Sequence, residues 1–492
     1  MKKIIIIMLI LAGVVNSYAQ VNTKTFDKNK AFENYPKFKI SQKKSPVLKM
    51  PKFDIAAMLE EDEAVKGMDV PFRFGKGFDV NYTLKDGHWE NTNDGRVWSL
   101  LFQSEGAYSI NFIFSKLFLP EGGELYMYYT EGTMVYGPVT SKQNLKEGTF
   151  LTDLVQGDAV TIHIFEPEKA KDKTRLAISR VVHAYTDTYS GFSSGLKSAT
   201  LNCHNNVDCY SGWEDESDGV ALILLSSGDA QCSGSLVNNT ANDYTPYILT
   251  ANHCLDENET SWLFKFGFRE NDCGGMNYSA TTYNGSVLTS SWADSDFALL
   301  VMNDSPVGNG NVTFLGWDNS DNTPTSGTCI HHPAGDYMKI SFDINGLTTN
   351  TQIIDWDFGP DSPVSTHWVV GLDNGAIERG SSGSPLFNQN SRVIGQLHGG
   401  QIQCPPATEY FGQFHVSWEG NNTNITQLEH WLDPNSTGAS TTNLLRSPSL
   451  TVPDVICYSG TTVSIQNAPN VTITWGGTNV LYPYAGQTHT FF

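Results

Sequence analysis

The stretch Gly380-Ser381-Ser382-Gly383-Ser384-Pro385 decides how this chain is interpreted. Its two glycines flank a pair of serines, and glycine lets the backbone turn sharply and approach a bound molecule closely. Such a turn presents one serine hydroxyl and directs backbone N–H groups toward the same point. Because Gly/Ser-rich hexamers are also common in ordinary loops, the stretch needs support from elsewhere in the chain.

Two upstream segments provide that support. Thr250-Ala251-Asn252-His253-Cys254 follows the apolar run Tyr247-Ile248-Leu249, and Ser295-Asp296 comes directly before another apolar run, Phe297-Ala298-Leu299-Leu300. A histidine, an acid and a serine thus follow one another along the chain, each with its own local signature. The chain resembles the chymotrypsin-like serine proteases in this order of groups. Alone, His253 would read as a buried histidine at a strand end; the combination favours catalysis.

Residues 198–440, about half of the chain, resemble the bacterial lysyl endopeptidases, a secreted branch of the chymotrypsin-like proteases. The resemblance implies an all-β fold of two six-stranded antiparallel barrels with the active site between them. It rests on motifs along the whole segment: Cys232 to Thr240, Leu249 to Cys254, Ser295 to Leu300, Ile330-His331-His332-Pro333, Gly380 to Pro385, Gly395 to Gly400 and Trp431-Leu432-Asp433-Pro434.

The resemblance assigns a role to each catalytic group. Ser382 is the nucleophile, because the family's serine is followed by Gly-x-Pro. His253 takes the hydroxyl proton and returns it to the leaving amine, while Asp296 holds the imidazole tautomer. The backbone N–H groups of Gly380 and Ser382 form the oxyanion hole, in which one donor contributes about 3–4 kcal/mol.

The resemblance also assigns the group that binds the substrate side chain. The family binds the ammonium of the residue before the cleaved bond (P1) with an acid three residues before a glycine, and Glu409 precedes Gly412 in this way. The known lysyl enzyme has aspartate here. One methylene is worth only about 1–3 kcal/mol in discrimination, so a basic P1 residue is expected, with lysine over arginine left open. The alternative is that Glu409 is a solvated loop charge.

Two further side chains match the family's cleft. His398 and Trp356 correspond to a histidine and a tryptophan thought to lie near the triad, and Trp356, in a variable loop, is alternatively a core residue. His331 and His332 are adjacent and would point in different directions, which makes a poor metal pair, so we take them as structural. No metal and no cofactor is expected.

All eight cysteines follow residue 200. In an exported protein they indicate disulfides. The sequence has no Cys-x-x-Cys pair, which argues against a structural zinc site. The resemblance implies the pairs Cys203–Cys404, Cys209–Cys273 and Cys232–Cys254. Cys329 is then expected to be a buried thiol, and Cys457 to lack a partner within this chain.

The N-terminus indicates export. Met1-Lys2-Lys3, the apolar run Ile4 to Val15 and the small residues up to Ala19 form a secretory signal pattern, too short to span a bilayer. We therefore expect a secreted protein, with attachment to the cell surface left open. The net charge of −21 disfavours nucleic acid as a partner. Residues 203–492 hold only six of the 31 Lys and Arg, as expected of a protease that spares its own mature domain.

The pattern along the chain predicts four parts: a signal peptide (1–19), a propeptide (20–197), a protease domain (198–440) and a linker with a truncated Ig-like β module (441–492). Within the propeptide we expect a flexible leader to about residue 50, a β-sandwich from Phe53 to Pro167, and an exposed connector from Lys169 to Lys197. A helix is predicted around Ile425 to Leu432, capped by Asn424.

These observations predict a secreted serine endopeptidase, a monomer, that cleaves proteins or peptides after lysine, with arginine left open as a second P1 residue. We expect it to free itself by cutting after Lys197. Ser381 stands where trypsin-type zymogens have an aspartate, so control by the propeptide is expected instead. Two alternatives remain. One is a protease of this fold with another P1 preference, and the other is a catalytically silent adhesion or binding protein.

Overall fold

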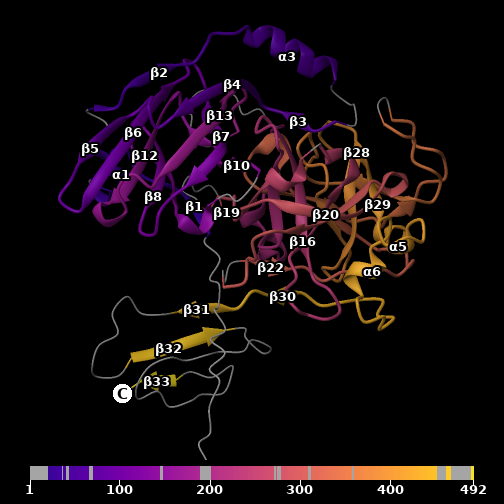
Figure 1. The fold of residues 1–492 in the computed structure, drawn as a ribbon. Helices are drawn as coiled ribbons and strands as arrows, with labels where there is room; N and C mark the ends of the chain where they lie inside the picture. The colour runs from indigo at the N-terminus through magenta and orange to yellow at the C-terminus, as the bar shows by residue number, and fades with distance from the viewer. Residues whose placement is uncertain are drawn as a thin grey trace, which may run out of the picture.

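The computed structural model describes residues 20–35, 37–39, 44–65, 70–144, 148–188, 201–256, 258–270, 273, 279–308, 312–356, 359–451, 461–466 and 489–491. β-strands are the main regular structure of this part of the chain, and helices are few and short (Figure 1). The signal pattern, Lys197 and Cys457 lie outside the described residues. No described helix is long and apolar enough to cross a bilayer.

The N-terminal unit consists of two sheets that share one core. In the first sheet the strands are ordered β2 (Val47–Lys49), β6 (Gly95–Gln103), β12 (Ala159–Pro167), β8 (Glu124–Tyr129) and β9 (Met134–Val139), with β5 (His88–Asn91) on β6. The second has β10 (Phe150–Leu151), β7 (Ser109–Phe118), β13 (Arg175–Ala184) and β4 (Gly75–Thr83), with β11 (Val155–Gln156) on β7. Phe102 of the first sheet and Phe112 of the second pack edge to face in the core, 4.9 Å apart.

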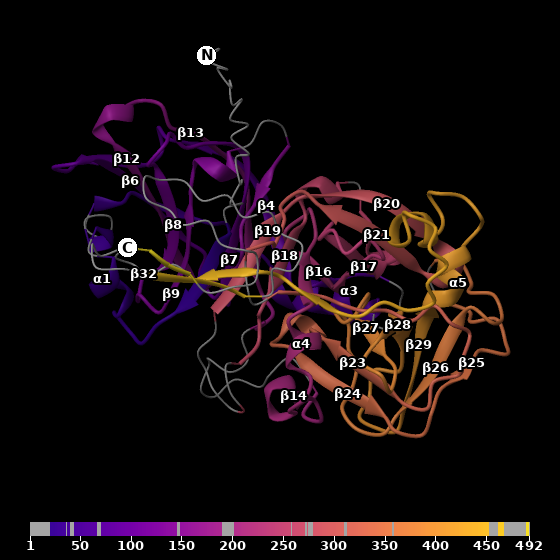
Figure 2. The same ribbon diagram turned by 90° about the horizontal axis from the view of Figure 1, so that it is seen from below.

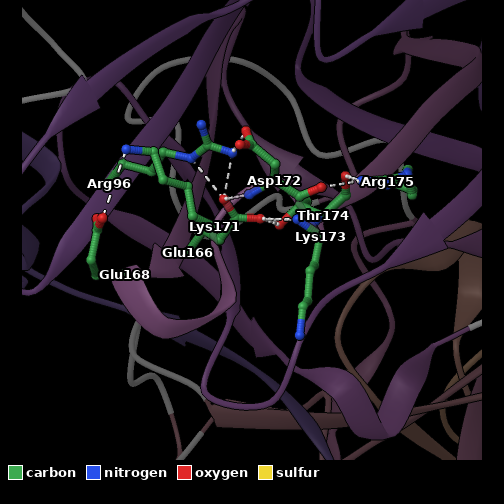
Figure 3. A network of polar contacts seen from close by, with 8 residues as sticks. All are labelled: Arg96, Glu166, Glu168, Lys171, Asp172, Lys173, Thr174 and Arg175. Carbon is green, nitrogen blue, oxygen red and sulfur yellow. Dashed lines mark hydrogen bonds and ion pairs between the residues drawn. The ribbon is translucent and has the colours of Figure 1, made fainter.

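The connector predicted from Lys169 onward is wrong over β13. This strand lies between β7 and β4 and buries Ile178, Val181 and Val182. The turn that leads into it is organised by the carboxylate of Glu166, which accepts hydrogen bonds from Arg96 Nε (2.7 Å) and Thr174 Oγ1 (2.6 Å) (Figure 3). Burial opposes ionisation, but these hydrogen bonds outweigh it and lower the pKa of Glu166. The surrounding Lys and Arg residues hid this strand in the sequence.

The flexible leader is also wrong for the described part of residues 20–50. β1 (Val21–Thr25) pairs with β9 on one side and with β19 (Ser279–Asn284) on the other. Short helix α1 (Ala31–Asn34) follows, and Phe38 stacks on Tyr128 with ring centroids 4.3 Å apart. Apolar residues spaced among the lysines supply this packing. A ten-residue helix in the predicted sandwich, α3 (Ile55–Ala64), was not predicted; Asp54 caps it by accepting from the Ala57 N–H.

The C-terminal unit has two antiparallel sheets, where the resemblance implied two six-stranded barrels. The first orders β19, β18 (Leu263–Phe266), β15 (Val220–Leu224), β16 (Ala230–Val237), β17 (Tyr247–Ala251), β21 (Phe297–Met302) and β20 (Ser286–Trp292). The second orders β14 (Asn205–Asn206), β24 (Lys339–Asp343), β23 (Gly327–His331), β27 (Pro385–Phe387), β28 (Val393–Gly400), β29 (Ala407–Gln413), β26 (His367–Leu372) and β25 (Thr348–Thr349). Figure 2 shows both beside the N-terminal unit.

Two helices follow β29. α5 (Phe414–Glu419) was not predicted. α6 (Glu429–Leu432) is shorter than predicted, because the Thr426 N–H donates to the Thr423 carbonyl in a separate turn before it. Beyond residue 440, where the protease domain was expected to end, β30 (Leu445–Arg446) pairs with β22 (Thr313–Phe314). The packed unit therefore extends to the buried Ser447. Three short strands come after it: β31 (Ser449–Thr451), β32 (Thr461–Gln466) and β33 (His489–Phe491).

The two units are joined by backbone pairing. Through β1, the first N-terminal sheet continues into the first C-terminal sheet, and together they form one 15-stranded sheet among the described residues. β3 (Phe72–Arg73) adds a second link by pairing antiparallel with Ala230 and Gln231 of β16. Continuous β-sheet between the units gives them a fixed mutual orientation.

Candidate active site

His253 and Asp296 form a hydrogen-bonded pair at one end of two neighbouring strands. His253 lies in a short 3-10 turn after β17, and Asp296 directly precedes β21. β17 and β21 pair antiparallel with Ala251 opposite Phe297, which brings the two side chains together. Nδ1 of His253 lies 2.9 Å from Oδ2 of Asp296, and Oδ1 accepts from the His253 backbone N–H at 2.9 Å. The buried acid thus holds the imidazole by two contacts.

The backbone of Asp296 is shaped for this contact. Its φ of +53° lies in the left-handed region, which aspartate tolerates better than most residues. Its carbonyl accepts the N–H of Asn252, so the turn is bonded to the residue before the histidine. The Cys232–Cys254 disulfide holds the other side of His253 to β16.

The Ser382 loop needs its glycines for reasons of space and conformation. Gly380 and Gly383 have φ of +90° and +82°. A Cβ on Gly383 would lie 2.1 Å from Thr250 Oγ1 and 2.4 Å from the Ser233 carbonyl oxygen, so only glycine lets the loop pack against β16 and β17. Ser233 anchors the loop from the other side, since its Oγ donates to the Gly380 carbonyl and its N–H to that of Ser382.

His253 and Ser382 line the same cavity, between the two C-terminal sheets. Trp356, Glu378, Arg379, His398, Glu409 and, from the N-terminal unit, Val70 are among the other lining residues. Asp296 and Ser382 follow His253 in the chain by 43 and 129 residues. The tertiary structure therefore brings the three predicted catalytic side chains to one place.

The predicted oxyanion donors belong to the same loop. The N–H groups of Ser381, Gly383 and Ser384 are bonded to the carbonyls of Glu378, Leu397 and Ser381. Within the part of the chain that the structure describes, no backbone carbonyl accepts the N–H of Gly380 or Ser382. These two donors are thus available to a bound carbonyl oxygen.

Glu409 lies in β29 and is 1% exposed. Neither carboxyl oxygen has a hydrogen-bond partner among the described residues, and burial raises the pKa of Glu409 well above its usual range. Opposite Glu409, a Cβ on Gly400 would lie 2.2 Å from Oε2, so this glycine leaves the carboxyl its space. Glu409 is a buried acid at a cavity wall rather than a solvated loop charge.

His398 and Trp356 stack on each other with ring centroids 3.9 Å apart. Trp356 donates through Nε1 to Ser362 Oγ, which fixes the indole at the cavity. His398 also stacks on His253, with centroids 5.5 Å apart, and its Nε2 lies 3.7 Å from Asp296 Oδ2. Trp356 therefore lines the cleft, as the resemblance implied, rather than the core.

Sequence reasoning took His331 as structural and missed two other residues around this cavity, Glu378 and Arg379. His331 Nδ1 lies 2.7 Å from Ser381 Oγ, and burial lowers its pKa well below the usual range, so it supports the loop as a neutral group. Glu378 accepts from the Leu201 N–H (3.0 Å) and pairs with His204. Arg379 donates to the Asp62 and Pro71 carbonyls of the N-terminal unit. Neither Glu378 nor Arg379 has a local sequence signature, because each acts on a residue distant in the chain.

One histidine and acid cluster has the spacing of a metal site. Ligand atoms of His253, Asp296 and His398 lie within 4.8 Å of one another. Because the Asp296 carboxylate already accepts from His253, we interpret the cluster as a hydrogen-bonded one. The three disulfides have the pairs that the resemblance implied: Cys203–Cys404, Cys209–Cys273 and Cys232–Cys254. Cys329 is a buried free thiol.

Comparison with known proteins shows which family this chain resembles. A profile of the family described as "Lysyl endopeptidase, C-terminal domain" matches residues 198–412. This part of the chain is therefore similar to the C-terminal domain of the lysyl endopeptidases. A lysyl endopeptidase of Pseudomonas aeruginosa is 24% identical over 300 residues, which cover 54% of this chain and 61% of that protein. The chain thus spans about three-fifths of the length of this lysyl endopeptidase.

Two solved structures that are similar to this chain are proteases of lower identity. The active form of the Rv3671c protease from M. tuberculosis is 14% identical, with a TM-score of 0.32, and the match covers 48% of this chain and 96% of that one. The MamO protease domain from Magnetospirillum magneticum is 13% identical, with a TM-score of 0.28, over 41% of this chain and 93% of that one.

Proposed function

We propose that this protein is a secreted serine endopeptidase that cleaves peptide bonds after lysine. The observation that carries the proposal is one cavity lined by His253, paired with a buried Asp296, by Ser382 on a glycine-dependent turn, and by the buried acid Glu409. The match of residues 198–412 to the lysyl endopeptidase profile supports the same activity.

Each group has a defined task in this reaction. The Ser382 hydroxyl attacks the substrate carbonyl while His253 accepts its proton, and the N–H groups of Gly380 and Ser382 stabilise the oxyanion. His253 then protonates the leaving amine, which leaves an acyl-enzyme. Water deprotonated by His253 releases the new carboxyl end, and Ser382 regains its proton. Throughout, Asp296 keeps Nδ1 of His253 protonated and stabilises the imidazolium.

The surroundings of Glu409 support a cationic P1 side chain. A buried carboxyl with no described hydrogen-bond partner is costly, and a lysine ammonium would supply both charge and donors. An apolar side chain would leave that acid unsatisfied. Because the guanidinium of arginine is larger than an ammonium and the glutamate is longer than the family's aspartate, we propose lysine as the main P1 residue and arginine as the weaker one.

The N-terminal unit is the proposed propeptide. Its residue Val70 lines the active-site cavity, and β3, which begins two residues later, pairs with the strand that carries Ser233. Arg379, three residues before Ser382, donates to the carbonyls of Asp62 and Pro71 at 3.3 and 3.0 Å. These contacts support a precursor whose cleft is covered by its own chain until the connection near Lys197 is cut.

A digest of a proteome-derived peptide library, read by mass spectrometry, tests activity and specificity together. We expect new C-termini to end in lysine, with fewer in arginine. Cleavage after other residues would overturn the role of Glu409. Absence of cleavage by processed protein, together with failure of an organophosphonate to label Ser382, would favour the silent binding protein.

Processing is tested by two variants of the full chain. Ser382→Ala is expected to remain full length, and Lys197→Gln to remain full length and inactive until another protease cuts it. If Ser382→Ala is processed as the wild type is, a different protease makes the cut. If uncut Lys197→Gln hydrolyses peptides normally, the N-terminal unit does not inhibit the enzyme.

A further inference from the structure

A third histidine, His367, extends the hydrogen-bonded cluster away from the cavity. It begins β26, is fully buried, and lies with its Nε2 2.9 Å from Nδ1 of His398. Its Nδ1 lies 2.8 Å from the Thr366 hydroxyl. The contacts therefore run from Thr366 through His367 and His398 to Asp296.

The hydroxyl of Thr366 determines where protons lie in this chain of contacts. It has one proton and donates it to the Pro363 carbonyl oxygen at 2.7 Å, because a carbonyl can only accept. Toward His367 the same oxygen can then only accept. Nδ1 of His367 therefore carries a proton.

Only one proton fits between His367 Nε2 and His398 Nδ1. If both rings were neutral, it would belong to Nδ1 of His398, because a neutral imidazole has one N–H and His367 already uses its own. Nε2 of His398 would then turn a lone pair toward Asp296 Oδ2, 3.7 Å away. Such an arrangement places two electron-rich atoms opposite each other in a buried site.

One additional proton removes this conflict. His367 then donates through both ring nitrogens, and His398 presents an N–H edge to Asp296. The positive charge of the pair compensates the carboxylate of Asp296, which is 2% exposed. At 3.7 Å the contact with Asp296 is electrostatic rather than a direct hydrogen bond.

We propose that His367 is a positioning residue, which with His398 holds one proton more than a neutral pair and so keeps Asp296 ionised and oriented toward His253. This inference rests on the proposed peptidase function. His367 does not line the cavity that holds Ser382, so its loss should lower kcat and leave KM nearly unchanged.

Other ionisable groups also act on this cluster. His253 and Asp296 face His398 directly, while Glu409 and Arg379 line the cavity beside it. Tyr410 packs against Trp356, the ring that covers His398. A change in the pH profile of kcat is therefore assigned to the pair His367 and His398 only under two conditions. It must follow substitution of His367, and the inflection that belongs to His253 must remain.

Three variants separate positioning from packing. His367→Phe keeps the ring and removes both nitrogens, and His367→Gln keeps an N–H that can donate to His398 but cannot titrate. His415→Phe is the matched control, since this histidine packs on Trp368 of β26 with ring centroids 5.6 Å apart. Their kcat and KM are measured with a lysyl amide substrate, using protein purified in its active form.

We expect kcat to fall about tenfold in His367→Phe, the lower end of the loss that follows removal of the partners that orient metal-ligating histidines. His367→Gln should recover most of the loss at neutral pH but lack the inflection that the pair adds to the pH profile of kcat. His415→Phe should match the wild type. An unchanged kcat in His367→Phe, or a loss that His367→Gln does not recover, would overturn the proposal.

The proton count has a direct readout that needs no activity. In the full-length Ser382→Ala protein with ¹⁵N-labelled histidine, NMR at neutral pH should find three of the four ring nitrogens of His367 and His398 protonated. Two protonated nitrogens would overturn the inference. A wild type that cleaves nothing while the count is three contradicts the peptidase function instead, so the two failures are distinguishable.

Discussion

Nζ of Lys265 lies 3.0 Å from Oδ2 of Asp153, and both side chains are almost fully buried where the two units meet. Thr23 of β1 donates to the same carboxylate, so three parts of the chain meet at one charge pair. Lys265 is one of only two lysines after residue 202, and the interface hides it from the solvent. The pair thus links the N-terminal unit to the sheet that carries His253.

Removing one partner of this pair should be costly. In the full chain, Asp153→Ala leaves a buried cation without its counter-charge, and we expect a loss of about 3–5 kcal/mol in the free energy of unfolding, measured with urea. The double variant Asp153→Leu/Lys265→Met should lose less, because no charge is left unpaired. Glu105→Ala, which removes the partner of the exposed Lys52, serves as a control without measurable effect. Equal losses in the single and double variants would contradict this account.

Glu409→Gln should stabilise the protein at neutral pH. The folded-state pKa of Glu409 lies well above its unfolded value, so the stability that its neutral form provides is complete below the unfolded pKa of about 4.3 and is lost as the pH rises toward the folded pKa. Glutamine stays neutral throughout. At pH 8 we expect the Tm of the variant to exceed that of the wild type by about 2–4 °C for each kcal/mol gained in the free energy of unfolding. At pH 4 we expect the two proteins to have the same Tm.

The same substitution should remove lysine preference. Only the ionised Glu409 attracts an ammonium, so kcat/KM for a lysyl substrate in the wild type should rise with pH through the raised pKa of this residue. Glu409→Gln should lose most of that activity and lack this rise. Unchanged cleavage after lysine by the variant would place the P1 site elsewhere.

Asp296→Asn should leave the fold intact and lower kcat by about 10⁴, because an amide can donate to Nδ1 of His253 and so favours the wrong tautomer. Cleavage of a lysyl amide and a thermal melt measure the two effects. A small loss of kcat would mean that His253 does not depend on Asp296 for its tautomer.

Gly383→Ala should distort the Ser382 loop. Two costs combine: the left-handed backbone at φ of +82°, about 1–2 kcal/mol, and a Cβ 2.1 Å from Thr250 Oγ1. Gly212 of the C-terminal unit is the matched control, since it has φ of +93° and a Cβ there would meet nothing within 4 Å. Gly212→Ala isolates the backbone cost. Labelling of Ser382 by an organophosphonate should fail only in the Gly383 variant.

The motifs around the site were predictable because their causes are local. A glycine-flanked serine, a histidine after an apolar strand and an acid before one each reflect a turn whose conformation the neighbouring residues dictate. β13 and β1 were missed for the opposite reason. Their Lys and Arg neighbours suggested solvent, and only pairing with strands distant in sequence buries Ile178 and Val21.

His367, Glu378 and Arg379 illustrate the same limit within the site. Their partners are His398, Leu201 with His204, and the carbonyls of Asp62 and Pro71. Sequence spacing carries no information about such contacts, because sheet topology sets them. Likewise, no sequence pattern indicated that Val70 of the N-terminal unit lines the active-site cavity.

By itself, the order of residues specified the chemistry available to this protein: which serine is exposed on a turn, and which imidazole and carboxylate accompany it. Short-range backbone preferences suffice for that. Folding in three dimensions decided what those groups meet, including a glutamate that has no counter-ion among the described residues and a chain of imidazoles behind the acid. Burial and proton sharing arise only when distant strands pack together.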